Sequence, residues 1–220
     1  MKTYSVLNAV KKRKSVRAYT NKPIPNSLIK QLLTQASLAP SGGNLQPWKV
    51  YVINKKSMSN FLAFQQNWTQ ADEPAYEIYP RELKEPYRSE RWKVGEAMYA
   101  ALGIPREDKG ARIEQVLKNY QFFGAPAAFF CFIDRQMGPP QWSDLGMFLQ
   151  TFMLLAQEAG LSTCAQEAWS LKQDCVKQFT QAKDELTLFC GMAIGYEDKD
   201  NPINGFKTSR LPLKDWLTFV

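Results

Sequence analysis

The spacing of apolar residues along the chain predicts a mixture of helices and strands. Apolar side chains recur at helical spacing after Pro25 as far as Ala36 and stop before Pro40, which predicts a helix. Residues 48–53 alternate as a strand does, and residues 127–133 are continuously apolar, as in a strand buried on both faces. Further helices are expected at 3–12, 92–102, 107–120 and 171–182, and further strands at 163–166 and 186–194. Because these elements do not alternate as regular βαβ units, we expect the α+β class, in one domain that spans residues 1–220.

Residues 145–159 predict the most apolar helix of the chain. Ser143 or Asp144 can cap its start, and Gly160 follows its end. A helix that is apolar nearly all round must be covered on every side, and a second copy of so small a chain is a natural cover. The tail from residue 195 to 220 has many turn signals, yet its apolar side chains also need a surface. Both features predict a homodimer.

Residues 67–91 are expected to form an excursion from the core. The segment is polar, interrupted by proline and rich in aromatic residues. Long loops of this kind are often functional, and a solvated loop with scattered aromatic side chains is the alternative. The sequence supports the two interpretations equally.

Composition narrows the possible chemistry. Hydrophobic residues make up 45% and charged residues 22% of the 220 positions, as in soluble globular proteins. Histidine is absent, which excludes Ser-His-Asp and Cys-His catalysis and His-ligated zinc. The N-terminus lacks the apolar core of a signal peptide, and the longest apolar run is too short to cross a bilayer. The four cysteines, none in a CxxC pair, are Cys131, Cys164, Cys175 and Cys190. We therefore expect free buried thiols in the cytoplasm, with no metal site and no membrane partner.

The net charge of +7 is unevenly distributed. Residues 1–71 contain eleven Lys and Arg and no acidic residue, whereas the remainder has 17 basic against 21 acidic residues. This asymmetry suggests a polyanion or a phosphate-bearing ligand, and a solvated basic face is the plainer explanation. No nucleic-acid-binding module is recognisable, so a small phosphorylated ligand explains the cluster more economically than a nucleic acid does.

Two short segments carry candidate chemistry. Residues 13–17 (Arg-Lys-Ser-Val-Arg) combine fixed positive charges with a hydroxyl, a suitable set of donors for a phosphate. Residues 39–48 (Ala-Pro-Ser-Gly-Gly-Asn-Leu-Gln-Pro-Trp) offer glycines for close backbone approach, and polar side chains for the edge of a heterocycle. Taken singly, a solvated basic turn and a simple helix-to-strand turn are the commoner outcomes. Walker and Rossmann phosphate motifs are both absent from the sequence.

Together the two segments resemble the nitroreductase family of flavin mononucleotide (FMN) enzymes. The resemblance continues in order along nearly the whole chain, through residues 119–126, 142–150, 160–169, 191–196, Asn204 and 207–212. It implies the nitroreductase-type fold, with a central mixed or antiparallel sheet flanked by helices. It also implies an intertwined homodimer whose C-terminal tail extends onto the partner, with FMN at the interface.

The resemblance assigns roles to individual residues. Arg13, Ser15 and Arg210 should hold the FMN phosphate and ribityl chain, and Lys14 and Lys207 are also assigned to cofactor binding. Arg17 should face the N1/O2 edge of the flavin ring, where a fixed cation favours the negative charge that accumulates on reduction. Asn119 should contact the pyrimidine edge, and Gln166 and Glu167 lie where a backbone N–H meets N5. The loop residues Pro40, Ser41, Gly42 and Asn44 should reach the flavin of the other subunit, and Gln46 of the same loop is also assigned to the cofactor.

The implied activity is reduction of nitroaromatic, quinone or similar electron-poor acceptors by NAD(P)H, in a ping-pong mechanism through the flavin. The flavin carries the chemistry, so no side chain is expected to act as a catalyst. Part of the 67–91 excursion should cover the acceptor as a lid, with Tyr76, Tyr79, Tyr87 and Arg88 as its candidate residues. A flavin storage or sensor protein, a polyanion-binding module, and ene reduction, dehalogenation or flavin fragmentation are the alternatives.

Overall fold

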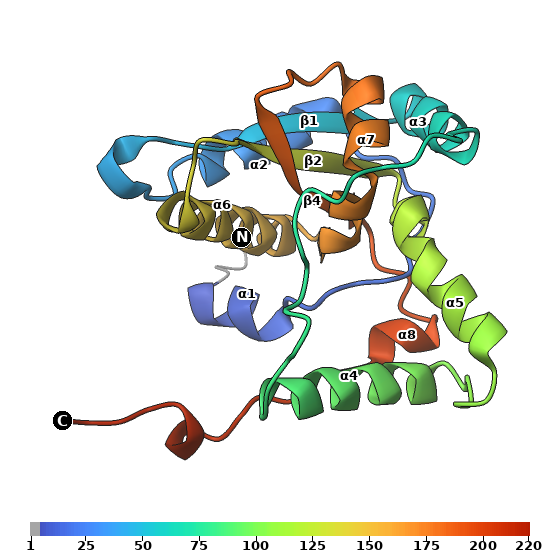
Figure 1. Cartoon of the computed structure of the whole chain (residues 1–220), viewed down its shortest axis with the longest axis vertical. Helices are drawn as coiled ribbons and strands as arrows, with labels where there is room; N and C mark the ends of the chain where they lie inside the picture. The colour runs from blue at the N-terminus through green and yellow to red at the C-terminus, as the bar shows by residue number, and fades with distance from the viewer. Residues whose placement is uncertain (1–4) are drawn as a thin grey trace.

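The computed structural model describes residues 5–220 and has the predicted α+β architecture (Figure 1). The α-helices are α1 (Val6–Lys12), α2 (Asn26–Ala36), α3 (Lys56–Gln66), α4 (Tyr87–Ala101), α5 (Lys109–Leu117), α6 (Pro139–Glu158), α7 (Gln173–Thr180) and α8 (Pro202–Gly205). The strands are β1 (Lys49–Asn54), β2 (Ala127–Asp134), β3 (Ser162–Gln166) and β4 (Leu186–Gly195). Short 3-10 helices span Gly42–Asn44, Lys118–Gly124, Glu167–Lys172 and Leu213–Asp215. Residues 3 and 4 of the first predicted helix lie outside the described residues.

Among the described residues, the strands form one antiparallel sheet in the order β1-β2-β4-β3. In the register, Val50 of β1 lies opposite Cys131 of β2, and Cys164 of β3 lies opposite Ala193 of β4. Strands β1 and β3 are the two edges of this sheet. The site described below is built at the β3 edge, and within residues 5–220 no strand pairs with the outer edge of β1.

Strand β2 is buried on both faces, as its continuous apolar run predicts. Phe129 and Cys131 pack into a core shared with α2 and α6, whereas Phe130 and Phe132 pack into a second core shared with α3 and α7. Successive side chains of a strand point to opposite faces, so one apolar run serves both cores. Helices therefore cover both faces of the sheet.

The long helix α6 begins earlier than its apolar pattern predicts. It starts at Pro139 after the N-cap Gly138. Proline suits this position because the N–H groups of the first helical turn have no acceptor within the helix, so the N–H that proline lacks is not missed. The prediction that Ser143 or Asp144 caps the helix is therefore wrong, since both lie inside it. Gly160 follows its end with φ of +77°, as predicted. Much of the helix is buried within the chain, whereas Met147 remains exposed.

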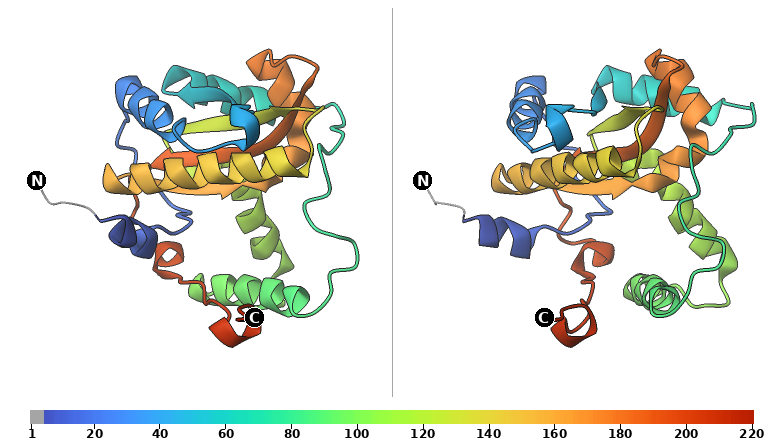
Figure 2. Two further views of the ribbon diagram at one scale, coloured as in Figure 1. Left: turned by 90° about the vertical axis from the view of Figure 1, so that its left-hand side faces the viewer. Right: turned by 60° about the vertical axis from the view of Figure 1, so that its left-hand side comes forward.

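An arm, residues 77–117, extends from the body of the molecule. It consists of an irregular stretch followed by α4 and α5, and both views in Figure 2 show α4 well away from the sheet. Helix α4 begins at Tyr87 rather than at residue 92, directly after Pro86 at its N-cap. None of its side chains is fully buried among the residues that the structure describes. The preceding residues 68–76 are tied to the body, where the N–H of Ala75 donates to the carbonyl of Ser170 at 2.9 Å.

The C-terminal tail lies against little of its own chain. Trp216 and Phe219 are 63% and 91% exposed. All four cysteines are free and buried, which confirms that part of the sequence interpretation. Within residues 5–220, no helix is long and apolar enough to cross a bilayer, and no group of three or more potential metal ligands is present.

Candidate active site

A cleft of about 1180 Å³ lies between the arm and the body of the molecule. The arm contributes residues 78–85 and one face of α4, and the body contributes the end of β3 and the start of the 3-10 helix after it. Four residues that the family resemblance assigns to the cofactor line this cleft: Arg17, Asn119, Gln166 and Glu167. The fold thus brings together residues from three distant parts of the sequence.

Arg17 reaches the cleft because the chain around it runs along the outer edge of β3. Ser15 forms a bridge with Thr163, and the N–H of Val16 donates to the carbonyl of Thr163 at 3.0 Å. An extended backbone alternates its side chains, so Val16 is buried while its neighbours face outwards. The Arg17 guanidinium donates to the carbonyl of Ser15 at 3.3 Å. Among the described residues it has no carboxylate partner, so its charge is available to a ligand.

Asn204 holds the same basic segment from α8. Its buried side chain accepts from the N–H of Arg17 at 2.9 Å and donates to the carbonyls of Ala18 and Asp198, each at 2.8 Å. The amide therefore uses both its oxygen and its nitrogen to fix the backbone on which Arg17 sits. The resemblance includes Asn204 without giving it a role, so only the structure reveals this positioning function.

Arg13 and Arg210 form a second cationic group. Partial burial lowers the pKa of Arg13, and the nearby positive charge of Arg210 lowers it further. Arg210 donates to the hydroxyl of Thr208 at 2.6 Å and to the carbonyl of Ser209 at 2.8 Å. Neither arginine has a carboxylate partner within the part of the chain that the structure describes. Two unneutralised guanidinium groups held near each other favour an anionic ligand such as a phosphate.

The neighbouring lysines differ from these arginines. The Lys14 ammonium pairs with Glu197 at 2.7 Å and donates to the carbonyl of Asn204, so its charge is neutralised within the chain. Lys207 is exposed, and Ser15 is exposed beside the arginines.

Two amides form part of the cleft floor. The Nε2 of Gln166 donates to the backbone oxygen of Asn119 at 2.7 Å and to its Oδ1 at 3.3 Å. Gln166 is buried, yet its Oε1 has no hydrogen-bond partner among the described residues. Leaving a buried acceptor unpaired costs stability, and a ligand with an N–H or O–H donor would restore the missing bond.

The backbone beside Asn119 is held in an uncommon conformation. Phe122 and Phe123 have φ of 48° and 55°, values that bulky residues seldom adopt. Both rings are buried, and the ring of Phe122 stacks on Trp169 with centroids 4.7 Å apart. Aromatic packing thus stabilises the tight turn that directs Asn119 towards Gln166.

Glu167 is exposed and lines the cleft, at the start of the 3-10 helix that follows β3. Partial removal from water raises the pKa of its carboxyl. No ion pair with Glu167 forms among residues 5–220.

The glycine-containing loop, residues 39–48, lies outside this cleft. The N–H of Gly42 donates to the carboxylate oxygens of Asp144 at 3.2 and 3.3 Å, which ties the loop to α6. Gly43 has a positive φ of 57°, and Asn44 and Gln46 also have positive φ. The cofactor residues assigned to this loop are therefore not beside Arg17 in the same chain.

The structure separates the four lid candidates. Tyr79 and Arg88 line the cleft, whereas Tyr76 and Tyr87 do not. Tyr76 packs against Trp142 with ring centroids 5.2 Å apart, and its hydroxyl donates to the carbonyl of Phe189. Its contacts are those of a residue that anchors the base of the excursion to the body.

Of the α4 residues that line the cleft, sequence reasoning assigns only Arg88 to the site and misses the others, among them Arg91, Trp92 and Gly95. The signal that could have found them is helical spacing, because Arg88, Arg91, Trp92 and Gly95 recur at intervals of three and four. The prediction that the excursion continues to residue 91 hides this spacing.

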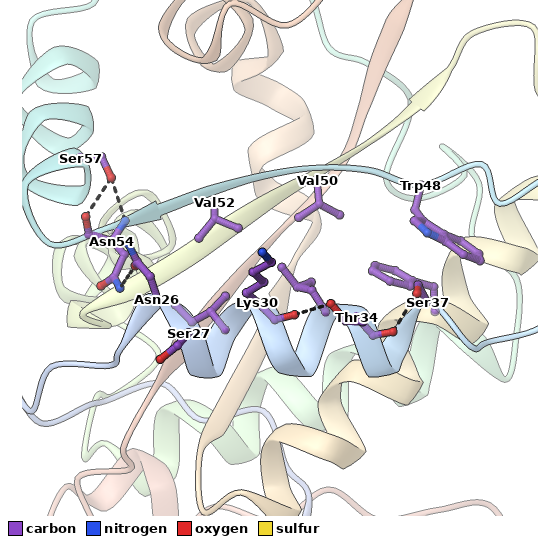
Figure 3. A pocket seen from close by; sticks show the side chains of 13 residues that line it. Asn26, Ser27, Lys30, Thr34, Ser37, Trp48, Val50, Val52, Asn54 and Ser57 are labelled. Carbon is purple, nitrogen blue, oxygen red and sulfur yellow. Dashed lines mark hydrogen bonds between the residues drawn. The ribbon is translucent and has the colours of Figure 1, made fainter.

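A second hollow, of about 630 Å³, lies at the opposite edge of the sheet. Figure 3 shows it between α2 and β1, with Val50, Val52 and Trp48 along one side. Trp48 stacks on Phe148 with ring centroids 4.8 Å apart, and at the other end Asn54 donates to Asn26 at 2.7 Å. Lys30 is the one charged residue among the described residues that line it. This groove is largely apolar and lies beside the open edge of β1.

Comparison with known proteins identifies the family. The model of the nitroreductase family matches residues 10–196. The chain belongs to the nitroreductase family. This nitroreductase is 36% identical to the 4-nitrobenzoate reductase of Pseudomonas putida, over 96% of this chain and 93% of the relative. It is 32% identical to the nitrobenzene nitroreductase of Ectopseudomonas oleovorans, over 96% and 95% of the two chains. The crystal structure of the FMN and NADPH-dependent nitroreductase NfnB from Sphigopyxis sp. strain HMH is 41% identical, covers 99% of both chains and superposes with a TM-score of 0.93.

The side chains of this nitroreductase fit an FMN group. Arg13 and Arg210 offer unneutralised cations for a phosphate, and Arg17 offers a third at the cleft. The unpaired Oε1 of Gln166 offers an acceptor for an N–H of a heterocycle. This set of donors and acceptors suits a planar, hydrogen-bonding ring that carries a phosphate.

Proposed function

We propose that this nitroreductase is an FMN-dependent oxidoreductase that passes electrons from NAD(P)H to nitroaromatic, quinone or similar electron-poor acceptors. The observation that carries the proposal is the meeting of Arg17, Asn119 and Gln166 in one cleft. The bound flavin would supply hydride chemistry, with donor and acceptor using it in turn. Because the flavin would carry the hydride chemistry, the enzyme would need no histidine as an acid or base, and the sequence contains none.

The residues of the chain would bind and orient the cofactor. Arg13, Ser15 and Arg210 would hold its phosphate end, and Asn119 and Gln166 would meet the polar edge of its ring. Arg17 would place a permanent positive charge where electrons accumulate, which lowers the energy of the reduced cofactor. Asn204 would keep Arg17 in position.

The relatives support nitroaromatic acceptors in particular. Two of them are named for the reduction of 4-nitrobenzoate and nitrobenzene, and a third is described as FMN and NADPH-dependent. No observation specifically favours a storage or sensor protein, or the other flavin chemistries. The proposed donor is therefore a nicotinamide, and the proposed acceptor is a nitroarene.

The test is the anaerobic reaction of the purified protein with NADPH and nitrobenzene. We expect yellow protein with one FMN per subunit. The flavin absorbance should be lost on addition of NADPH and should return on addition of nitrobenzene. With both reactants in excess, each subunit should reduce many molecules of nitrobenzene per minute. Colourless protein that takes up no FMN on titration would refute the proposal. Flavin-loaded protein that turns over no acceptor would instead favour the storage protein.

We further infer that the protein is a homodimer with cofactor at its interface. The open β1 edge, the apolar groove of Figure 3 and the exposed Trp216 and Phe219 support this inference, because each leaves apolar surface or backbone groups uncovered. The tail of each subunit would lie against the partner. The loop that carries Pro40, Ser41, Gly42 and Asn44 would reach the partner's cofactor, which explains its distance from the cleft of its own chain.

The arm would cover the acceptor, with Tyr79 and Arg88 facing the cleft. A flat electron-poor ring could then stack beside an aromatic side chain. The four free thiols support a reducing compartment, the cytoplasm.

A further inference from the structure

The cleft-facing side of α4 carries charges that differ in how they are paired. Arg88 is bound to Glu85 at 2.8 Å, and Glu96 is bound to Arg112 at 2.6 Å. Arg91 also lines the cleft, yet its guanidinium has no carboxylate and no hydrogen-bond acceptor among residues 5–220. Its partner is the ring of Tyr79, whose centroid lies 4.1 Å from the central guanidinium carbon.

Contact with the Tyr79 ring restrains the Arg91 side chain without using its N–H groups. A guanidinium over an aromatic ring is held by the ring quadrupole, and its planar set of donors remains available for a carboxylate or a phosphate. Restraint before binding reduces the entropy that a ligand contact must overcome. Arg91 is therefore a prepared anion-binding group at the wall of the cleft.

The residues beside Arg91 suit a flat ligand. Trp92 lines the same cleft and is 55% exposed, so its aromatic face is accessible to a ligand there. One turn further along α4, Gly95 leaves open space, because a side chain there would meet nothing within 4 Å. An aromatic plane, a gap and an unpaired cation thus occupy one wall.

We propose that Arg91 selects for an anionic oxygen group on one of the two reactants. The group is either the carboxylate of a nitroaromatic acid or the 2′-phosphate of NADPH, and the same bidentate contact would bind both. This inference rests on the proposed function, because it assigns the cleft to the same reaction. It adds a specificity-determining residue that lies outside the cofactor-binding set.

The experiment compares Arg91→Gln with Arg91→Lys and with the control Lys93→Gln. Lys93 is on the same helix, is paired with Glu90 at 2.7 Å and does not line the cleft. The KM and kcat are measured for 4-nitrobenzoate and for nitrobenzene, which lacks the carboxylate, and then for NADPH and NADH. We expect Arg91→Gln to raise the KM of the reactant that carries the anion about tenfold, equivalent to about 1.4 kcal/mol. The KM of its uncharged or unphosphorylated counterpart should be unchanged, and Arg91→Lys should recover part of the loss.

The two arms distinguish the source of the anion. A selective change with 4-nitrobenzoate assigns Arg91 to the acceptor, and a selective change with NADPH assigns it to the donor. The proposal would be overturned if Arg91→Gln left the KM ratio of 4-nitrobenzoate to nitrobenzene and that of NADPH to NADH unchanged. It would also be overturned if the KM rose equally for charged and neutral reactants.

A binding measurement separates this inference from the proposed function. Calorimetric titration of the FMN-loaded protein with benzoate and benzamide, and with 2′,5′-ADP and 5′-AMP, requires no turnover. Weaker binding of benzoate or 2′,5′-ADP to Arg91→Gln, but not to Lys93→Gln, would support the anion site even if no nitro compound is reduced. Equal binding of each probe to both variants would contradict it. Wild-type protein that binds these probes but reduces nothing would refute the proposed function alone.

Discussion

At the scale of single residues, the two groups of arginine in the site should have separable effects. Arg17 lines the cleft without a carboxylate partner among the described residues, whereas Arg13 lies near Arg210. A permanent cation beside the polar edge of the flavin favours the electron-rich form, and a preference of about 1 kcal/mol corresponds to about 20 mV for two electrons.

Arg17→Gln should therefore retain FMN while lowering the midpoint potential of the flavin by roughly 10 to 20 mV and slowing reduction by NADPH. The control, Arg13→Gln, should weaken FMN retention and leave the potential nearly unchanged. Spectroelectrochemical titration of both flavin-replete variants measures the effect. An unmoved midpoint in Arg17→Gln would refute the role assigned to Arg17.

Glu167 provides a prediction about pH. Partial desolvation raises the pKa of its carboxyl in the folded protein, so the folded state holds the proton more tightly than the unfolded state does. The ionised carboxyl therefore destabilises the folded protein. This destabilisation is absent at pH values below the unfolded pKa and grows as the pH rises through the raised folded pKa. The free energy of unfolding of Glu167→Gln, relative to wild type, should therefore increase from pH 4 to pH 7. Urea unfolding at several pH values measures it, and a difference that stays constant with pH would argue against a raised pKa.

At the scale of elements, α8 is joined to the basic segment mainly through Asn204. Asn204→Ala removes three side-chain hydrogen bonds and leaves partly buried backbone groups unpaired, which should cost about 2 to 3 kcal/mol of stability and weaken FMN binding. Asn204→Asp keeps the acceptor for the Arg17 N–H and should have an intermediate effect. Urea unfolding and FMN titration measure the two changes, and wild-type FMN affinity in Asn204→Ala would show that the basic segment needs no such support.

The excursion should behave as two parts with different roles. Its base is anchored through Tyr76, so Tyr76→Phe should lower stability by about 1 kcal/mol and leave the KM of acceptors unchanged. Its outer part faces the cleft, so Tyr79→Ala should raise the KM of nitroaromatic acceptors several-fold and leave FMN content intact. Steady-state kinetics and thermal unfolding of the two variants form a matched pair. If the KM of nitroaromatic acceptors in Tyr79→Ala equalled that in Tyr76→Phe, this segment would be only a solvated loop.

At the scale of the whole molecule, the apolar surfaces that the described residues leave uncovered provide a test of the proposed homodimer. The tail exposes Leu213, Trp216 and Phe219, and the groove beside β1 is largely apolar. Deleting residues 213–220 should therefore shift the protein towards monomer and reduce FMN retention, because cofactor sites at an interface need both chains. Sedimentation velocity at micromolar concentration measures the change, with Lys214→Gln as a control that keeps the apolar tail. A truncated protein that sediments like the intact one would exclude the tail from the interface.

Local patterns in the sequence were enough to predict several secondary-structure elements and the kind of ligand. The apolar periodicity after Pro25 and the continuous apolar run of β2 depend only on neighbouring residues, so α2 and β2 were predictable. The absence of histidine, which excluded histidine-based catalysis, likewise needs no structure to interpret. The same is true of the basic charge of residues 1–71, which favoured a small phosphorylated ligand over a nucleic acid. The family resemblance added which residues should hold it.

Tertiary structure decided which of these residues meet. Arg17, Asn119 and Gln166 converge because an extended segment joins the β3 edge and because a strained turn lies beside Asn119, and neither pairing follows from local spacing. The same holds for Tyr76 and Tyr79, which look alike in the sequence: the Tyr76 hydroxyl donates to the carbonyl of Phe189 in the body, whereas Tyr79 lines the cleft. Periodicity reports which face of an element is buried, but the partner of that face depends on contacts between distant segments. For that reason most of the elements could be predicted from the sequence, although α3 and the first turns of α4 and α6 were missed. The unpaired Arg91 on the wall of the cleft emerged only from the fold.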